Sequence, residues 1–270
     1  MPELPEVERA ARRIRRAVVG RTIARVRLIH PAFVRRITRR AVSSLRAHTI
    51  TAVEQRAKHQ LLVLDDGRAL HVHFRMAGDW KLDRVGDELP RSARVSIDFT
   101  DGKRLLLVDP RALSSIALLP KGHTPFDDLG PDPSSDDFDA ALGAALARRS
   151  AAIKPSLLDQ RVAAGVGNIY AAEALWEARI DPRVPARSLT PPQVRALAAA
   201  IRLVLDRGRA SGGRYRDGEA VLRVYGREGE PCPRCGTPIE RIVQAGRSTC
   251  FCPRCQAHAE PEAARSPVKR

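Results

Sequence analysis

The sequence predicts an α+β protein in which a leading helix and an antiparallel β-domain precede a helical region and a small cysteine module. Three observations support this: apolar residues at helical spacing in 4–19, short β-rich runs within 21–119, and helical patterns after residue 137. With 270 residues, the chain is long enough to bury a real core, in one large domain or two modest ones.

The leading helix is predicted from apolar residues at steps of three and four positions: Leu4, Val7, Ala11, Ile14 and Val18. Proline and acidic residues open this pattern, and Gly20 closes it. The first ten residues carry acids and no apolar run, and no stretch approaches the length of a membrane span. We therefore expect neither a signal peptide nor a membrane helix, and a cytoplasmic, nucleoid-associated protein.

The β-domain is predicted from four runs rich in β-forming residues, at 60–64, 69–74, 94–99 and 104–108. Asp66-Gly67 and Asp101-Gly102 separate the members of each pair, and Asp-Gly is a strong signal for a hairpin turn. Several such strands in succession predict an antiparallel sandwich or barrel.

The second half of the chain follows a segment, 120–137, that is dense in Pro, Gly and Asp and is predicted to be a linker. Amphipathic patterns then predict helices at 138–148, 153–160, 168–179 and about 190–207. The last helix has Thr190 as its expected N-cap, Pro191 at its first position and Gly208 at its end. Residues 257–270 lack periodicity, so we expect a disordered tail.

The charge balance points to a polyanionic partner. Lys and Arg number 47 against 31 Asp and Glu, which gives a formal net charge of +16. Only six of these cations are lysines, and arginine grips phosphate in a planar fork. Codon usage in a GC-rich genome accounts for part of the Arg-to-Lys ratio but not for the net charge.

The most specific motif is a pair of CxxC sequences separated by sixteen residues. Four thiolates at this spacing match a tetrahedral Zn²⁺ site, so the expected ligands are Cys232, Cys235, Cys252 and Cys255. Such a site is structural, because four thiolates leave no open position for water. A redox CxxC pair is the alternative, although no βαβ context surrounds it. Cys250 is out of register and is expected to be a spectator.

Two further motifs suit phosphate binding and amine catalysis. The Gly165-Val166-Gly167 turn precedes a helix, where backbone N–H groups suit phosphate oxygens, although many such turns are merely tight. Lys154 is a candidate phosphate ligand, with a solvated helix terminus as the alternative.

Removal of Met1 exposes the secondary amine of Pro2, whose pKa the adjacent helix N-terminus lowers. Such an amine can form an iminium, with Glu3 or Glu6 as general acid, although Pro and Glu are also ordinary first-turn residues.

Taken together, the motifs resemble those of the formamidopyrimidine-DNA glycosylase and endonuclease VIII family over residues 2–256. The motifs that carry the resemblance, in chain order, are Pro2-Glu3-Leu4-Pro5-Glu6-Val7-Glu8, Ala57-Lys58, Met76-Ala77-Gly78, Asp109-Pro110-Arg111, Gly165-Val166-Gly167-Asn168-Ile169-Tyr170, Tyr225-Gly226-Arg227 and the two CxxC pairs.

The resemblance implies an N-terminal β-sandwich catalytic domain with a leading helix (1–130), a helix–two-turns–helix domain (131–228), a zinc β-hairpin (229–256) and the tail (257–270). It implies a monomeric glycosylase with β,δ-lyase activity on oxidised or ring-opened bases, acting on damaged or abasic duplex DNA bound in a basic cleft between the halves. It also implies one structural Zn²⁺ per chain.

The resemblance also implies residue roles. Pro2 is the expected Schiff-base nucleophile, Glu3 the acid that protonates the sugar ring oxygen, and Lys58 a phosphate ligand that assists proton transfer. Glu6 is expected to help hold the lesion pocket. The residues expected to clamp phosphates are Lys154, Asn168 and Arg247, and those expected to fill the gap left in the base stack are Met76, Arg111 and Leu113.

Some positions depart from the family pattern. Leu113 stands where an aromatic wedge is usual, and only eleven residues, 214–224, separate Gly213 from Tyr225. Members that favour 8-oxoguanine resemble one another in having a longer loop there, so this preference is in doubt. Two alternatives stay open: a catalytically silent paralogue that binds damaged or abasic DNA, and a zinc-ribbon RNA-binding protein that leaves the N-terminal motif unused.

Overall fold

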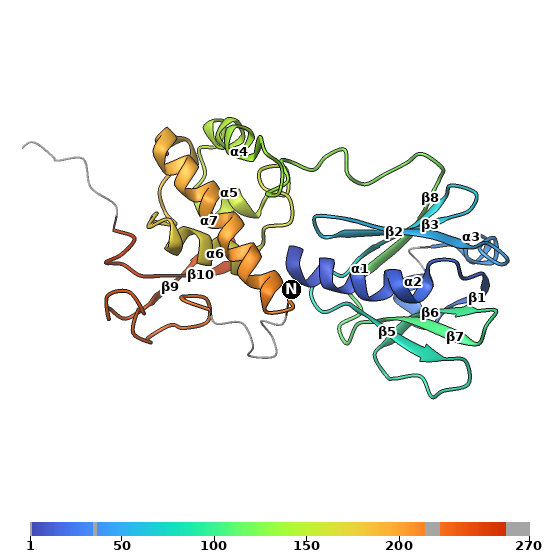
Figure 1. Cartoon of the computed structure of the whole chain (residues 1–270). Helices are drawn as coiled ribbons and strands as arrows, with labels where there is room; N and C mark the ends of the chain where they lie inside the picture. Colours follow the sequence, from blue (N-terminus) through green and yellow to red (C-terminus); the bar gives the residue numbers. More distant parts are fainter. Residues whose placement is uncertain (1, 35–36, 214–221, 258–270) are drawn as a thin grey trace, which may run out of the picture. The chain divides into compact units, whose positions relative to one another are not determined.

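The computed structural model describes residues 2–34, 37–213 and 222–257 (Figure 1). The chain divides into two compact units, Met1–Gly130 with Asp206–Ala220, and Pro131–Leu205 with Val221–Arg270. Among the described helices, none combines the length and the apolar character that crossing a bilayer requires. The α+β class predicted from the sequence is confirmed, since antiparallel sheets dominate the first unit and helices the second.

The first unit begins with α1 (Leu4–Val18), an amphipathic helix whose apolar stripe is buried as predicted. Glu3 is its N-cap, and a capping box links Glu3 and Glu6 through reciprocal side-chain to backbone hydrogen bonds. The helix contacts β2 and β3 of one sheet and β5 of the other. Its buried side chains, such as Val7 and Ile14, join the same hydrophobic core as both sheets.

Two four-stranded antiparallel sheets form the sandwich. One has the order β2-β3-β4-β8, with strands Ile50–Arg56, His59–Leu64, Ala69–His73 and Ser115–Leu119. The other has the order β1-β6-β7-β5, with strands Ile23–Leu28, Ala93–Phe99, Lys103–Val108 and Asp79–Arg84. The predicted Asp-Gly hairpins are confirmed: they join β3 to β4 and β6 to β7, with positive φ at Gly67 and Gly102.

The four strands expected from the sequence are the four inner strands, β3, β4, β6 and β7. The four that the pattern missed, β1, β2, β5 and β8, are the four sheet edges. The inner strands β3 and β7 contain apolar runs, and β4 and β6 show apolar residues at alternate positions. In β1 and β5, exposed charged residues interrupt the apolar positions. Two short helices, α2 (Pro31–Val34) and α3 (Arg39–Ser43), also lacked a clear pattern.

The second unit contains the predicted helices and the cysteine hairpin. Its elements are α4 (Phe138–Ala147), α5 (Ile153–Leu158), α6 (Asn168–Glu177), a 3₁₀ turn (Ala186–Ser188), the first part of α7 (Pro191–Ala210), β9 (Glu240–Gln244) and β10 (Arg247–Phe251). The strands β9 and β10 pair in antiparallel register as a hairpin.

The expected end of the last helix at Gly208 is wrong, because α7 continues through it to Ala210. Arg209, in the added turn, forms a two-point ion pair with Glu8 of α1, with N···O distances of 2.8 and 2.9 Å. This contact offsets the roughly 1 kcal/mol that a glycine costs inside a helix. The chain then leaves the helix at Gly212 and Gly213, both with positive φ.

Candidate active site and metal centre

The N-terminus of α1 brings together Pro2 and Glu3, which were predicted to be catalytic, and Glu6, which was predicted to help hold the lesion pocket. Pro2 and Glu3 are buried, and Glu6 is half-buried. The backbone N–H of Glu3 donates to the Glu6 carboxylate at 2.9 Å, and the Glu3 side chain accepts from the first turn. Pro2 therefore lies immediately before a helix N-terminus, where the macrodipole disfavours a protonated amine.

The end of α7 supports this site within the first unit. A Cβ on Gly213 would lie 2.9 Å from the Pro5 carbonyl oxygen and 3.1 Å from the Glu6 Cα, and its φ is +63°. Only glycine fits this close approach without a shift of backbone. Neither Arg209 nor a role for Glu8 was expected from the sequence, in which the acidic position within the PELPEVE motif was the available signal.

Lys58 lies in the turn between β2 and β3 and is 4% exposed. The turn is held by positive φ at Ala57 and by the Gln55 side chain, which donates to the Ala57 carbonyl at 2.7 Å. The burial of its amine is possible only with polar partners, so Lys58 is a side chain fixed in place rather than a solvated one.

Three histidines adjoin Lys58 on β3 and β4. His59 Nδ1 lies 2.9 Å from His71 Nε2 with the rings stacked, and His73 meets His59 edge-on. Burial, with smaller contributions from nearby charges that include Arg75 and Lys58, lowers the pKa of His59 to about 4 and that of His73 to about 3. The cluster is therefore neutral at physiological pH and adds no charge beside Lys58.

These pKa values predict an acid-sensitive fold. Between pH 6.5 and 4 these histidines are protonated in the unfolded chain and stay neutral in the folded chain. Because the unfolded chain binds more protons, the free energy of unfolding falls as the pH falls. Urea unfolding followed across this range should show the loss, and His59→Phe should make its slope shallower. A slope unchanged in His59→Phe would contradict the assignment to this cluster.

Arg111 and Leu113 project from a loop that two buried charges hold in shape. The Asp109 carboxylate accepts the backbone N–H groups of Arg111, Leu113 and Ser114 at 3.0, 2.7 and 2.7 Å. Burial raises the pKa of Asp109, but these bonds and the Ser114 hydroxyl hold it below its ordinary value. Arg111 and Leu113 remain exposed, and a Leu 40% exposed is available for an apolar contact.

Arg94, the second buried charge under this loop, was not expected from the sequence. Its guanidinium donates to the carbonyl oxygens of Asp109 and Pro110 at 2.6 and 3.2 Å. Gly78, beside Met76, lies against the same loop, since a Cβ there would be 2.8 Å from the Phe74 carbonyl and 3.0 Å from the Ser114 hydroxyl. The turn that carries Met76 and the loop that carries Arg111 and Leu113 therefore lie side by side.

The second unit brings the three predicted phosphate ligands together. Lys154 is fully buried, and its ammonium donates to the Asn168 side-chain oxygen and to the Ser248 carbonyl. Asn168 also donates to that carbonyl, at 3.1 Å. Arg247, the preceding residue on the β9–β10 hairpin, is exposed. The alternative for Lys154, a solvated helix terminus, is thus excluded.

The four cysteines predicted to bind metal converge in the second unit. Their sulfur atoms lie within 4.8 Å of one another, with 3.5 Å between Cys235 and Cys252 and 4.0 Å between Cys232 and Cys255. A tetrahedral zinc with bonds near 2.3 Å requires sulfurs about 3.8 Å apart. None of the five cysteines forms a disulfide, and Cys250 lies outside the cluster. The Trp176 indole N–H donates to Cys232 Sγ at 3.4 Å, as expected for a thiolate ligand.

Glu173 of α6 was not expected from the sequence. It is buried and accepts the backbone N–H groups of Arg223, Val224 and Tyr225 at 2.8–2.9 Å. Burial raises its pKa, although these bonds favour the charged form. It anchors the end of the short segment 214–224, whose residues 214–221 lie outside the described part of the chain.

Three family models match successive parts of this chain. The formamidopyrimidine-DNA glycosylase N-terminal domain matches residues 1–116, the H2TH domain of the same enzymes matches 129–216, and the zinc finger found in FPG and IleRS matches 229–257. The chain belongs to the formamidopyrimidine-DNA glycosylase family. The zinc-finger match and the geometry of the four thiolates together establish a structural zinc site of this family.

Relatives in this family match over nearly the full length. The formamidopyrimidine-DNA glycosylase of Chloroflexus aggregans is 43% identical over 95% of this chain and 98% of its own, and that of Paracoccus denitrificans is 40% identical over 95% and 100%. The Lactococcus lactis enzyme, solved non-covalently bound to DNA containing an AP site, has a TM-score of 0.86 at 30% identity, over 95% and 100%. The MutM (Fpg) protein of Thermus thermophilus has a TM-score of 0.82 at 36% identity, over 96% and 100%.

Proposed function

We propose that this protein removes oxidised or ring-opened bases from duplex DNA and then cleaves the abasic site by β,δ-elimination. Base-excision repair follows from the family, whose members are formamidopyrimidine-DNA glycosylases, some solved with DNA containing abasic or damaged sites. The observation that carries the mechanism is the buried Pro2-Glu3 pair at the N-terminus of α1.

The chemistry begins when the Pro2 amine, freed by removal of Met1, attacks the sugar C1′. The bond between C1′ and the base breaks, and the base leaves with the proton that the amine nitrogen gives up. Glu3 protonates the sugar ring oxygen, so the ring opens and an iminium links Pro2 to the sugar. β-Elimination then removes a proton from C2′ and breaks the C3′–O bond, δ-elimination removes a proton from C4′ and breaks the C5′–O bond, and hydrolysis of the remaining iminium frees the Pro2 amine. The helix N-terminus keeps the amine available by disfavouring its protonation.

The target nucleotide must leave the stack for this attack, because C1′ is out of reach in an intact duplex. Lys58 and the Lys154–Asn168–Arg247 group are proposed to hold the flanking phosphates, and Glu6 to border the lesion pocket. The support is geometric: the buried Lys154 ammonium and the Asn168 amide share the Ser248 carbonyl beside an exposed arginine. Charge-assisted bonds from such fixed donors to phosphate are strong.

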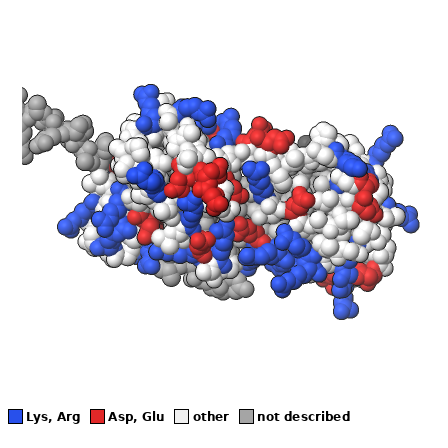
Figure 2. Space-filling model, turned by 45° about the horizontal axis from the view of Figure 1, so that its top comes forward, with Lys and Arg blue, Asp and Glu red and all other residues white. Residues whose placement is uncertain are grey.

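Met76, Arg111 and Leu113 are proposed to enter the gap that the flipped nucleotide leaves. Leu113 is an exposed apolar side chain on a loop held by Asp109 and Arg94, so little ordering is required on binding. An apolar wedge unstacks a base step without the stacking surface of an aromatic. The basic surplus attracts the duplex, and Figure 2 shows blue Lys and Arg side chains spread widely over the visible face.

A cleavage assay on matched duplexes tests the proposed function. Duplexes with one formamidopyrimidine, one abasic site or no lesion differ in a single nucleotide, and single-turnover rates separate chemistry from product release. We expect strand cleavage at the lesion and at the abasic site and none in the undamaged duplex. Tight binding of the damaged duplex without cleavage would instead identify a silent damage-binding paralogue.

Lesion choice is predicted to shift away from 8-oxoguanine. The short segment 214–224 leaves little chain to cover a flipped purine, and it completes the path to Tyr225, whose N–H binds Glu173. Formamidopyrimidines and oxidised pyrimidines should therefore be excised faster than 8-oxoguanine opposite cytosine. Single-turnover rates on the three lesions decide this, and a faster rate for 8-oxoguanine would show that the loop does not set preference.

A further inference from the structure

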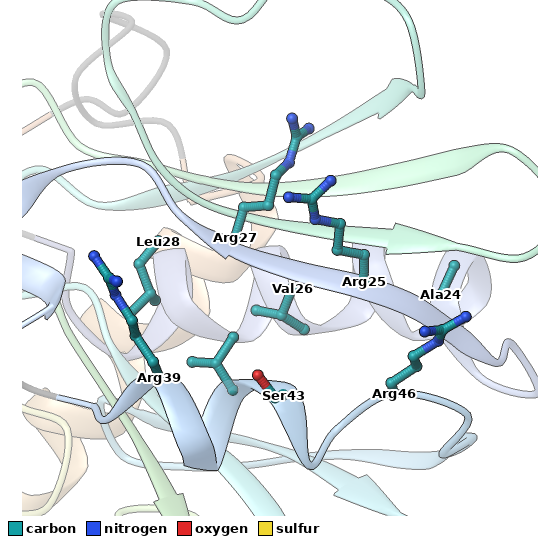
Figure 3. A pocket seen from close by; sticks show the side chains of 9 residues that line it. Ala24, Arg25, Val26, Arg27, Leu28, Arg39, Ser43 and Arg46 are labelled. Atoms are coloured by element: carbon teal, nitrogen blue, oxygen red, sulfur yellow. The ribbon is translucent and has the colours of Figure 1, made fainter.

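A cavity of about 950 Å³ lies between the edge strand β1 and the helix α3, among residues with no role in the proposed chemistry (Figure 3). Two kinds of side chain dominate its lining. The apolar ones are Ala24, Val26, Leu28 and Val42, and the basic ones are Arg25, Arg27, Arg39 and Arg46. In Figure 3 Arg39 extends from α3 toward β1, and Arg46 approaches from the turn after α3. This combination suits a ligand that is both acidic and partly apolar.

Three of the four arginines form no ion pair with an acidic residue in the described part of the chain. Arg27 is paired with Asp98 at 3.2 Å. Arg25, Arg39 and Arg46 are exposed, and no acidic side chain among the described residues forms an ion pair with them. Three like charges around one cavity repel one another, and carboxylates on a bound ligand would relieve this.

Some peptide groups of β1 face away from β6, the strand with which β1 pairs. Ile29 donates to the Arg94 carbonyl at 2.8 Å, and Arg27 pairs with Ser96, so these peptide groups face β6. Because alternate peptide groups point opposite ways, those of Val26 and Leu28 face away from β6, on the side where none of the described strands pairs with β1. On that side Ile23 is already bonded to His48 and Ala47, at 2.8 and 2.9 Å.

We propose that this cavity binds an extended acidic segment of a partner protein, which adds to β1 as a further strand. Its peptide groups would pair with those of Val26 and Leu28. Carboxylates on the face of the segment toward α3 would meet Arg39 and Arg46, and the alternate apolar side chains would lie on the opposite face, along the alkyl part of Arg25. A nucleic-acid backbone fits less well, because phosphates accept hydrogen bonds but cannot donate to the open carbonyl groups of the strand.

The test uses a fluorescein-labelled hexapeptide of alternating Asp and Val, titrated with the full-length protein and followed by anisotropy. The double variant Arg39→Glu/Arg46→Glu should weaken binding at least about tenfold. The matched control is Arg148→Glu/Arg195→Glu, which changes the net charge equally at exposed arginines without ion pairs among the described residues. It should bind the peptide within about twofold of the original protein. Equal losses in both variants, or no binding by the original protein, would overturn the proposal.

A change on the peptide side separates strand addition from charge attraction. Methylation of alternate backbone amides removes N–H donors and keeps every carboxylate, so it should also weaken binding about tenfold or more. Undiminished binding of the methylated peptide contradicts strand addition. Hexathymidylate or inorganic phosphate that binds more tightly than the peptide, and loses affinity in Arg39→Glu/Arg46→Glu, would overturn the proposal in favour of a phosphate site. Retained excision activity in the double variant shows that it is folded.

Discussion

Glu3→Gln is expected to lower the rate of base excision by roughly 10²–10⁴-fold. A glutamine amide cannot deliver the proton that opens the sugar ring, so the step that needs an acid slows. Abasic sites, in which the bond to the base is already gone, should still be cleaved. Single-turnover rates on a formamidopyrimidine duplex and on an abasic duplex measure the two activities separately.

The choice of glutamine separates catalysis from folding. Glu3 is also the N-cap of α1, and its side chain accepts a hydrogen bond from the first turn of the helix. A glutamine side-chain oxygen can still accept that bond, so the free energy of unfolding should change by less than about 1 kcal/mol. Equal losses on both duplexes in a stably folded variant would show that Glu3 is not the acid of base excision.

Cys252→Ser is expected to unfold the zinc hairpin and to lower DNA affinity at least about tenfold. Structural zinc contributes on the order of 10 kcal/mol to such a module. In the small apolar cluster around the cysteines, Ile239 of the hairpin packs with Val224 and with Trp176 of α6, so the hairpin has little apolar core of its own. Its loss removes Arg247 and releases the Ser248 carbonyl from Lys154 and Asn168. One lost charge-assisted contact alone costs about 1.5–3 kcal/mol.

Cys250→Ser is the matched control, because Cys250 is buried in the same hairpin but is not among the four clustered sulfurs. It should retain one zinc per chain and near-normal DNA affinity. Zinc content by mass spectrometry and duplex affinity by anisotropy measure both effects. Full affinity of Cys252→Ser with metal shown to be absent would contradict a structural role for the zinc.

The sequence predicted the helix α1 and the inner strands, whose apolar patterns are contained in short stretches of chain. The inner strands β3 and β7 contain apolar runs, β4 and β6 alternate apolar with polar residues, and α1 carries a single buried stripe, so the sequence pattern predicted all of them. The edge strands β1, β2 and β5 carry charged residues at exposed positions, and the pairing of β1 and β8 depends on partners distant in the chain. Propensity alone cannot identify such strands.

The functional residues also fall into two groups, those visible as local motifs and those that act through contacts distant in the chain. The N-terminal and cysteine motifs consist of residues close in sequence, so their spacing revealed the chemistry. Arg94, Glu173 and Arg209 act through contacts 15, 50 and 201 positions away in the chain. In the sequence, an arginine that will be buried and bonded to carbonyl oxygens cannot be distinguished from an exposed one. The motifs likewise gave no sign that Lys154 is fully buried.

Trapping the covalent intermediate tests the central claim most directly. Borohydride reduces an iminium to a stable amine, so protein shown to lack Met1 should become crosslinked to DNA carrying a damaged base or an abasic site. Peptide mass spectrometry should then place the sugar remnant on the nitrogen of Pro2, and protein that retains Met1 should bind DNA but give no adduct. A remnant on a lysine, or normal trapping by protein that retains Met1, would contradict the assignment of Pro2 as the nucleophile.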